Sequence, residues 1–382
     1  MSTRNHQRPY HVVGYRGYAA GTRALVLGRV LEDDRIAAPS PTFSRWRNLL
    51  DTLRRIESDP LAFAKTRVRI GNLLRTLTAD NEGFLHEWVT LPTALAGGAW
   101  HPAELELVTK PGAERAVTVA PILAPPADAE FGIISDMDDT VLQSEVTNFL
   151  RAAQLMLLEN ARTRLPFPGV AAFYRALEAG RRGNAPAAGA GNPIFYVSSS
   201  PWNLYDVITE FLEAQHIPAG PLLLRDWDFG RALLRTGEYK SAAIDEILRS
   251  YPTLPFILVG DSGQEDPEIY SAIVREHAGR ILAVYIRNVT SHPERSAAIQ
   301  ALAAGVQDAG STLVLADDTL TVARHAAAHG WIDPNRLAEI GVERRADEGT
   351  SGAKVETPGV ETDPKPTPTV VVDPDVKRRD VE

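Results

Sequence analysis

The chain has 382 residues, of which 44% are hydrophobic and 23% are charged, as in soluble globular proteins. This length allows two ordinary domains and a tail. Its 40 basic and 49 acidic residues give a formal net charge of -9, which argues against a nucleic-acid binder. The chain contains no cysteine, so disulfides, thiolate metal sites and a cysteine nucleophile are excluded.

The beginning of the chain carries no targeting signal that we recognise. Residues 1–11 are polar and charged, without the apolar core of a signal peptide, and we expect them to be flexible. No uninterrupted apolar run approaches the length of about 18 residues that a membrane-spanning helix needs. We therefore expect a cytoplasmic protein without a transmembrane segment.

Residues 12–127 contain short alternating patterns that are typical of β-strands, with a turn signal at 81–83. Apolar residues also recur with helical spacing between 46 and 56. Together these patterns predict a small β-sandwich domain with one inserted helix, followed by a linker around Pro121, Pro125 and Pro126. The clearest strand patterns are 25–31, 67–70, 84–89 and 103–108.

The predicted helix at 46–56 allows two roles. Arginines flank its apolar stripe, so it could lie on an anionic membrane surface. Asp51, Glu57 and Asp59 dilute this charge, however, and the stripe is more simply a face that packs on the β-domain. Binding of this helix to a membrane therefore stays the second of the two interpretations.

From 128 to 344 short apolar runs alternate with helical stretches, the pattern of a parallel sheet covered by helices on both faces. This predicts an α/β, Rossmann-like domain after the β-sandwich. Residues 345–382 are rich in proline, valine, threonine and charge without a period, and we expect a disordered tail there. The apolar runs are 131–135, 193–198, 221–224, 255–260, 281–286 and 312–316.

The first apolar run of this domain leads into Asp136, Asp138 and Asp139. Carboxylates that lie so close together beside a core repel one another and resist desolvation. A hard divalent cation such as Mg²⁺ would resolve that conflict, because it prefers oxygen ligands. Ligands of open α/β sheets bind beyond the carboxyl ends of the strands, where this cluster falls. We expect Asp139 to be a structural residue or a residue at the site entrance.

Three other segments supply complementary groups. Ser198, Ser199 and Ser200 end the second apolar run, and hydroxyl groups at a helix start suit a phosphate. Which of the three would face the phosphate stays open. Lys240 opens an amphipathic helix, where the helix dipole does not favour a cation, so we expect it to meet an anion. Asp261 and Asp266 follow the fourth run and could complete a metal site.

Several of these residues have plainer readings. Asp266 precedes Pro267 and could equally cap the helix that follows. Asp317 and Asp318 close the last apolar run as a further acidic pair, but they have no lysine or serine companions. We expect this pair to cap a helix beginning near Thr319.

The order DxDxT (136–140), strand-end serine, lysine and GDSGQxD (260–266) resembles the haloacid-dehalogenase superfamily of aspartate-nucleophile phosphatases. Within it, FYVSSSPWNLYD (195–206), LLLRDW (222–227) and ILVGDSGQEDPEIY (257–270) are similar to the catalytic domain of the fungal actin-patch phosphatidate phosphatase and its bacterial relatives. GYRGYAAGTRALVLGRVLED (14–33) also fits the β-domain of the bacterial members. The resemblance spans roughly residues 10–340.

This resemblance implies a role for each motif residue. Asp136 would be the nucleophile that accepts the phosphoryl group, and Asp138 would be the general acid and base. Ser198, with Ser199 beside it, and Lys240 would bind the phosphoryl oxygens. Mg²⁺ would be held by Asp136, the backbone carbonyl of Asp138, Asp261 and, through water, Asp266. The family often has histidine before the lysine, where this chain has Tyr239.

The resemblance further implies a Mg²⁺-dependent phosphatidate phosphatase, peripheral at the membrane surface, that forms diacylglycerol and phosphate. A first alternative keeps this chemistry with a soluble phosphomonoester as substrate. A second is a scaffold protein with a vestigial site. Segment 144–168 contains apolar and basic residues and would be either a lid for a lipid substrate or an ordinary covering helix. Protein partners and oligomeric state stay open.

Overall fold

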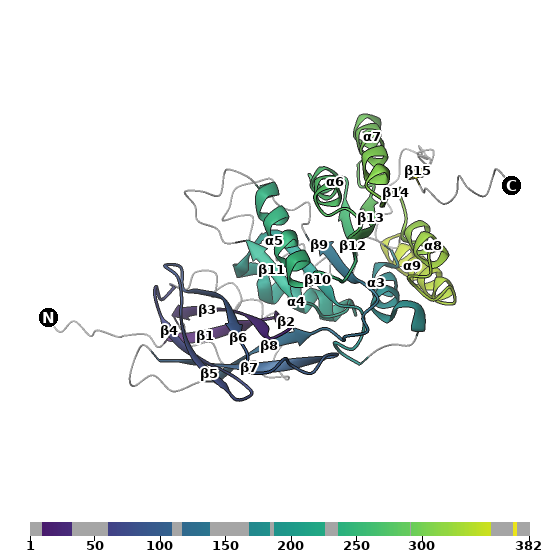
Figure 1. The fold of residues 1–382 in the computed structure, drawn as a ribbon. Coiled ribbons are helices and arrows are strands. Elements are labelled where there is room, and N and C mark those ends of the chain that lie inside the picture. Colours follow the sequence, from purple (N-terminus) through teal and green to yellow (C-terminus); the bar gives the residue numbers. More distant parts are fainter. Residues whose placement is uncertain are drawn as a thin grey trace.

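The computed structural model describes residues 10–32, 60–108, 117–137, 168–183, 187–225, 236–290, 292–352 and 370–372. These residues form an N-terminal β-domain and a C-terminal α/β domain that lie against each other (Figure 1). The predicted helix at 46–56 and almost all of segment 144–168 lie outside the described residues. Among the helices that are described, none is long and apolar enough to cross a membrane.

The described part of the β-domain is one sheet that runs in the order β1-β3-β2-β8-β7-β4-β5, with β6 paired to β3. All neighbouring pairs are antiparallel except β2 and β8, which are parallel. The four strands that the sequence predicts most clearly are confirmed as β3, β4, β6 and β7. The strands are β1 (Tyr10–Tyr15), β2 (Gly17–Ala20), β3 (Arg23–Glu32), β4 (Lys65–Ile70), β5 (Leu73–Thr78), β6 (Phe84–Thr90), β7 (Ala99–Leu107) and β8 (Val117–Ala124).

The two halves of this sheet pack face to face around a core of alternating residues. Val26 and Val30 of β3 belong to the same buried cluster as Val68 of β4 and Leu105 of β7. At one crossing β1 lies directly on β8, because a Cβ atom on Gly14 would stand 2.7 Å from the carbonyl oxygen of Val119. Alternation of apolar residues along the strands therefore gives this domain an interior of its own.

Pro121 does not belong to a linker, as the sequence suggested, but lies inside β8, opposite Pro102 of β7. A proline cannot donate to a strand ladder, and sheets accept it where no donor is needed. β2 pairs with β8 only at Ile122 and Leu123, which leaves Pro121 without a second strand beside it. The prolines suggested a linker, but Pro121 is compatible with a strand because no backbone donor is needed at its position.

All six apolar runs of the second domain are confirmed as strands. They are parallel and lie in the order β11-β10-β9-β12-β13-β14, with β15 added antiparallel at one edge. Each run is buried over at least half of its length, as expected for a sheet covered on both faces. The strands are β9 (Gly132–Asp136), β10 (Ile194–Pro201), β11 (Leu222–Arg225), β12 (Phe256–Asp261), β13 (Ile281–Arg287), β14 (Thr312–Ala316) and β15 (Val370–Val372).

Helices cover the sheet in two groups: α5, α6 and α7 lie together, and α3, α8 and α9 lie together across the sheet (Figure 1). From β9 the chain adds β10 and β11 on one side and then crosses to add β12, β13 and β14 on the other side, so the strand order reverses beside β9. A crevice forms at such a reversal. The helices are α3 (Val170–Ala179), α4 (Tyr205–Ala214), α5 (Thr236–Ser250), α6 (Asp266–Glu276), α7 (Pro293–Asp308), α8 (Thr319–Ala328) and α9 (Arg336–Gly352), with the short 3₁₀ turns η1 (Gly180–Arg182) and η2 (Trp202–Leu204).

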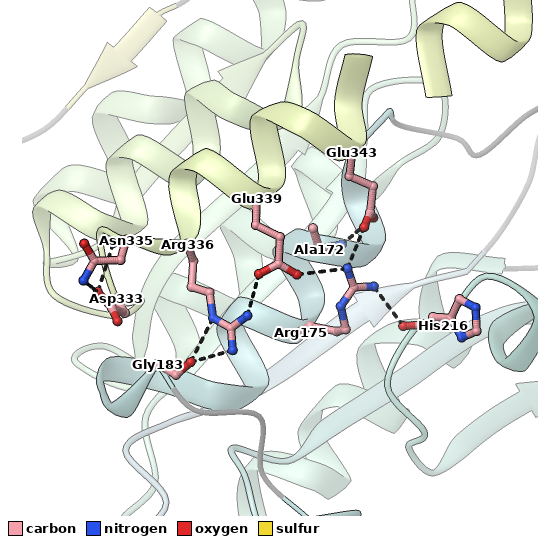
Figure 2. A network of polar contacts seen from close by, with 9 residues as sticks. All are labelled: Ala172, Arg175, Gly183, His216, Asp333, Asn335, Arg336, Glu339 and Glu343. Carbon is pink, nitrogen blue, oxygen red and sulfur yellow. Dashed lines mark hydrogen bonds and ion pairs between the residues drawn. The ribbon is translucent and has the colours of Figure 1, made fainter. Parts of the chain in front are cut away.

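Helix α9 continues to Gly352, beyond the boundary at 344 where the sequence predicted the tail to begin. Figure 2 shows that polar side chains of α9 bind other parts of the domain. Glu343 accepts a hydrogen bond from the Ala172 backbone N–H of α3 (2.8 Å) and pairs with Arg175 at 2.6 Å. Carboxylates at a helix N-terminus are stabilised by the exposed N–H groups and the helix dipole. The polar side chains of α9 therefore pack the helix against α3, which its sequence alone did not reveal.

Glu178 of α3 gives a testable consequence for stability. Burial raises the pKa of its carboxyl group from the ordinary 4.5 to about 7. The folded state binds this proton more tightly than the unfolded state does. The contribution of Glu178 to the free energy of unfolding is therefore fully present below pH 4.5 and is lost as pH rises through 7. We expect Glu178→Gln to raise the unfolding free energy at pH 8 by roughly 2–3 kcal/mol and to leave it nearly unchanged at pH 4. Denaturant melts at both pH values would measure this; an equal effect at both would contradict it.

Candidate active site

The predicted site residues that the structure describes meet at the carboxyl edge of β9, β10 and β12. β9 ends at Asp136, β10 carries Ser198, and β12 ends at Asp261. Lys240 comes from the second turn of α5, and Asp266 comes from the first turn of α6. The strand order brings these segments together at the reversal point beside β9.

Asp136 is the last residue of a buried strand, and its side chain is 3% exposed. One carboxylate oxygen, Oδ1, lies 2.8 Å from Nζ of Lys240. Its backbone carbonyl accepts a hydrogen bond from Oγ of Ser135 at 2.9 Å, and the same Oγ lies 2.6 Å from Oη of Tyr174. Because the Ser135 hydroxyl proton is used toward Asp136, Tyr174 must be the donor in the second bond.

Tyr174 lies behind this backbone carbonyl, on the buried face of α3. Burial raises the pKa of its hydroxyl to about 12, and the neighbouring negative charge of Asp136 adds to the rise. The hydroxyl therefore stays protonated and remains a donor. Sequence reasoning missed Ser135 and Tyr174, because an isolated serine in a strand and a tyrosine on an apolar helix face carry no motif.

Lys240 is fully enclosed, with 2% of its side chain exposed. It does not open its helix, as the sequence suggested, because α5 begins one turn earlier at Thr236. Its ammonium group lies between Oδ1 of Asp136 at 2.8 Å and Oδ1 of Asp266 at 2.9 Å. A buried ammonium ion is tolerated only with such partners. The expectation that Lys240 meets an anion is confirmed.

Asp266 has a side chain that is 0% exposed and serves both neighbours. While Oδ1 faces Lys240, Oδ2 accepts a hydrogen bond from the Asp261 backbone N–H at 3.2 Å. The N-cap position of α6 is occupied by Glu265, so the alternative reading of Asp266 as the cap is wrong. Gly260 is required beside it, since a Cβ there would come 2.5 Å from Oδ2 of Asp266. The carboxylate thus fixes the turn that presents Asp261.

Asp261 is half-buried, and its Oδ1 accepts a hydrogen bond from the Gly263 backbone N–H at 2.6 Å. Burial raises the pKa of its carboxyl group, the bond from Gly263 opposes this rise, and the charge of Asp266 adds to it. Asp136, Asp261 and Asp266 each offer an oxygen within 4.8 Å of the others. Three carboxylates thus face one ammonium group, and the all-oxygen donor set with its excess negative charge fits a hard divalent cation.

The three serines end β10 and are all buried. Ser198 pairs with Leu224 of β11 in regular register, and the register then shifts before Pro201. Oγ of Ser198 accepts a hydrogen bond from the Ser200 backbone N–H at 3.0 Å. The strand therefore has an irregularity at Ser199 and Ser200, and its pairing with β11 resumes at Pro201 and Arg225.

Some predicted features lie elsewhere or outside the described residues. Asp138 and Asp139 fall in the undescribed stretch 138–167, so their predicted roles rest on the sequence. The helix-cap interpretation of Asp318 is confirmed, because its side chain accepts a hydrogen bond from the Thr321 N–H of α8. Asp317 instead accepts one from the Asn288 side chain at 2.8 Å.

Comparison with known proteins places the site within a recognisable segment. Residues 131–288 match the sequence model of the family described as "Phosphatidate phosphatase APP1, catalytic domain". The chain is 31% identical over 173 residues to phosphatidate phosphatase APP1 of Saccharomyces cerevisiae, an alignment that covers 43% of this chain and 28% of the yeast protein. It is 28% identical over 163 residues to an uncharacterized protein of Schizosaccharomyces pombe, covering 42% of this chain and 25% of that protein.

Among solved structures, a carbohydrate acetylesterase from Xanthomonas citri is similar over 89% of this chain and 73% of its own, at 11% identity and a TM-score of 0.28. This score is too low to support any conclusion. The chain spans about a quarter of the length of the two yeast relatives. All the site residues described above lie within 131–288, the segment that matches the catalytic domain of this phosphatase family.

Proposed function

We propose that the protein is a Mg²⁺-dependent phosphomonoesterase that works through a phospho-aspartate on Asp136, with phosphatidate as its substrate. The observation that carries this proposal is the buried contact of Lys240 with Asp136 and Asp266, beside Asp261, at the reversal point of a parallel sheet. An ammonium ion and several carboxylates in one enclosed site suit the binding and transfer of a phosphoryl group. A scaffold with a vestigial site would have no need to keep this costly arrangement buried.

In the first step Asp136 attacks phosphorus, so that an aspartyl oxygen–phosphorus bond forms and the bond to the ester oxygen breaks. Asp138 gives its proton to the departing oxygen, which leaves as an alcohol. Lys240 is placed to share its charge between Asp136 and a phosphoryl oxygen, and the serine segment 198–200 supplies hydroxyl and N–H groups. These groups lower the cost of the charge on the transferring phosphoryl group.

In the second step Asp138, now a carboxylate, takes a proton from water. The oxygen of this deprotonated water attacks phosphorus, and the aspartyl oxygen–phosphorus bond breaks. This releases inorganic phosphate and restores Asp136. Mg²⁺ would be held by Asp136, the backbone carbonyl of Asp138, Asp261 and, through water, Asp266, and would neutralise part of the negative charge that otherwise repels the substrate from the nucleophile. The bonds that Ser135 and Tyr174 make keep the backbone of Asp136 fixed through both steps.

Phosphatidate as the substrate is inferred from the family and yeast relative that residues 131–288 resemble. Phosphate release should be measured from phosphatidate in mixed micelles and from a panel of soluble sugar and nucleotide monophosphates. We expect phosphatidate to be turned over fastest with Mg²⁺ present, and release to stop when EDTA removes the metal and return when Mg²⁺ is added back. Faster turnover of a soluble ester would reject the lipid assignment while leaving the chemistry intact.

A further inference from the structure

The serine segment 198–200 is joined directly to residues that the β-domain holds. Trp202 follows Ser200 by two residues, and its ring stacks on Tyr15 of β1 with ring centroids 4.7 Å apart and an interplanar angle of 20°. Tyr15 also contacts the ring of Tyr205, at a centroid distance of 4.4 Å. Trp202, Tyr205 and Tyr15 are all buried. One β-domain side chain therefore holds both ends of the turn that follows the serines.

Hydrogen bonds fix the same turn in direction as well as in place. The backbone N–H of Arg16 donates to Oη of Tyr205 at 2.8 Å, and the side chain of Arg29 donates to Oδ1 of Asn203 at 2.7 Å. The Arg29 guanidinium is itself held over the ring of Phe84, 4.2 Å from its centroid, and donates to the Glu82 carbonyl. A charged donor fixed by three partners gives a directional contact.

The contact between the two domains is a continuous core. Tyr18, Leu25 and Leu123 of the β-domain belong to the same buried cluster as the strands of the parallel sheet. Figure 1 shows β1 and β2 on the side of the β-domain that faces β10 and α4. A second patch of contacts between the two domains is formed by two hydrogen bonds. Trp88 donates to Glu246 at 2.7 Å, and Tyr251 donates to the Ala19 carbonyl at 2.8 Å. A core of this kind does not permit the domains to slide.

We propose that the β-domain is a structural part of the catalytic site, in which Tyr15, Arg16 and Arg29 are positioning residues for the serine segment 198–200. The pairing of β10 with β11 is irregular between Ser198 and Pro201 and resumes at Pro201 and Arg225, so the ladder alone does not fix the serines between these points. The next residues are held by β-domain contacts at Trp202, Asn203 and Tyr205. The segment 131–288 that matches the catalytic domain is therefore incomplete without residues 15–29. The assignment of the serines to phosphate binding rests on the proposed function; the positioning itself does not.

The test compares two variants of the full chain. Tyr15→Leu combined with Arg29→Met removes the stacking and the bond to Asn203 but keeps apolar bulk. The matched control, Trp88→Phe, removes one hydrogen bond at the second patch and keeps an aromatic ring between the domains. For each, hydrogen exchange of peptides covering 196–206, kcat/KM, inhibition by inorganic phosphate and the melting temperature should be measured.

We expect the double variant to exchange faster at 196–206, to lose about tenfold in kcat/KM and to bind inorganic phosphate several-fold more weakly, since small displacements of positioning groups cost this much. The control should keep wild-type exchange at 196–206 and wild-type phosphate inhibition. Unchanged exchange at 196–206 in the double variant would overturn the proposal, as would equal effects of both variants. If the wild type released no phosphate, the exchange comparison would still decide the positioning role while the proposed function failed.

Discussion

Replacing Asp136 with asparagine is expected to lower phosphate release by roughly 10⁴-fold or more, because an amide oxygen is a poor nucleophile toward phosphorus. Asparagine has nearly the same shape, and its side-chain oxygen can still accept a hydrogen bond from Lys240 across the present 2.8 Å. The loss should therefore appear in kcat, with the melting temperature little changed. Steady-state kinetics at saturating substrate and a thermal melt would measure both.

The matched control for this variant is Asp317→Asn. Asp317 also follows a strand of the parallel sheet, β14, but it binds Asn288 and lies outside the carboxylate cluster. We expect its variant to keep near wild-type turnover. If Asp136→Asn retained activity while it stayed folded, Asp136 would not be the nucleophile. If Asp317→Asn were equally inactive, the second acidic pair would have to be part of the chemistry.

The second large effect is expected from Lys240→Met, which removes the ammonium group that Asp136 and Asp266 share. Methionine fills a similar apolar volume, but the two buried carboxylates then face each other without a cation. Breaking a buried ion pair in this way costs about 3–5 kcal/mol. We expect loss of detectable phosphate release together with a lower unfolding free energy, measured by denaturant melts in EDTA at pH 7.5.

The pH dependence separates this charge effect from a packing effect. Without Lys240 the two buried carboxylates repel each other, and neutralising either one removes this repulsion. The free-energy cost is therefore present while both groups are charged and shrinks in acid. A stability deficit that is equal at pH 5 and pH 8 would point to packing instead. Lys65→Met, at an exposed lysine of β4, serves as the control and should change neither stability nor activity.

Much of the fold follows from local patterns that a sequence displays directly. The six apolar runs of the α/β domain are strands because each must bury both of its faces, and such a run stays apolar throughout. The boundaries of the helices were harder to predict from the sequence. The first turn of α5 and the part of α9 after Val342 are polar, and this part of α9 binds α3 through Glu343. A side chain that pairs with a distant helix looks solvated when only its neighbours in sequence are considered.

The sequence by itself determined which residue types the site has and in what order: Asp136, a serine segment, Lys240, Asp261 and Asp266 at the ends of strands or the starts of helices. The edge where they meet also follows, because parallel strands end at a common edge. Tertiary structure alone decided that Lys240 contacts both Asp136 and Asp266, that Tyr174 donates to Ser135 behind the nucleophile, and that β1 stacks on Trp202. These contacts join residues far apart along the chain, and their distances depend on how layers pack, which no local spacing encodes.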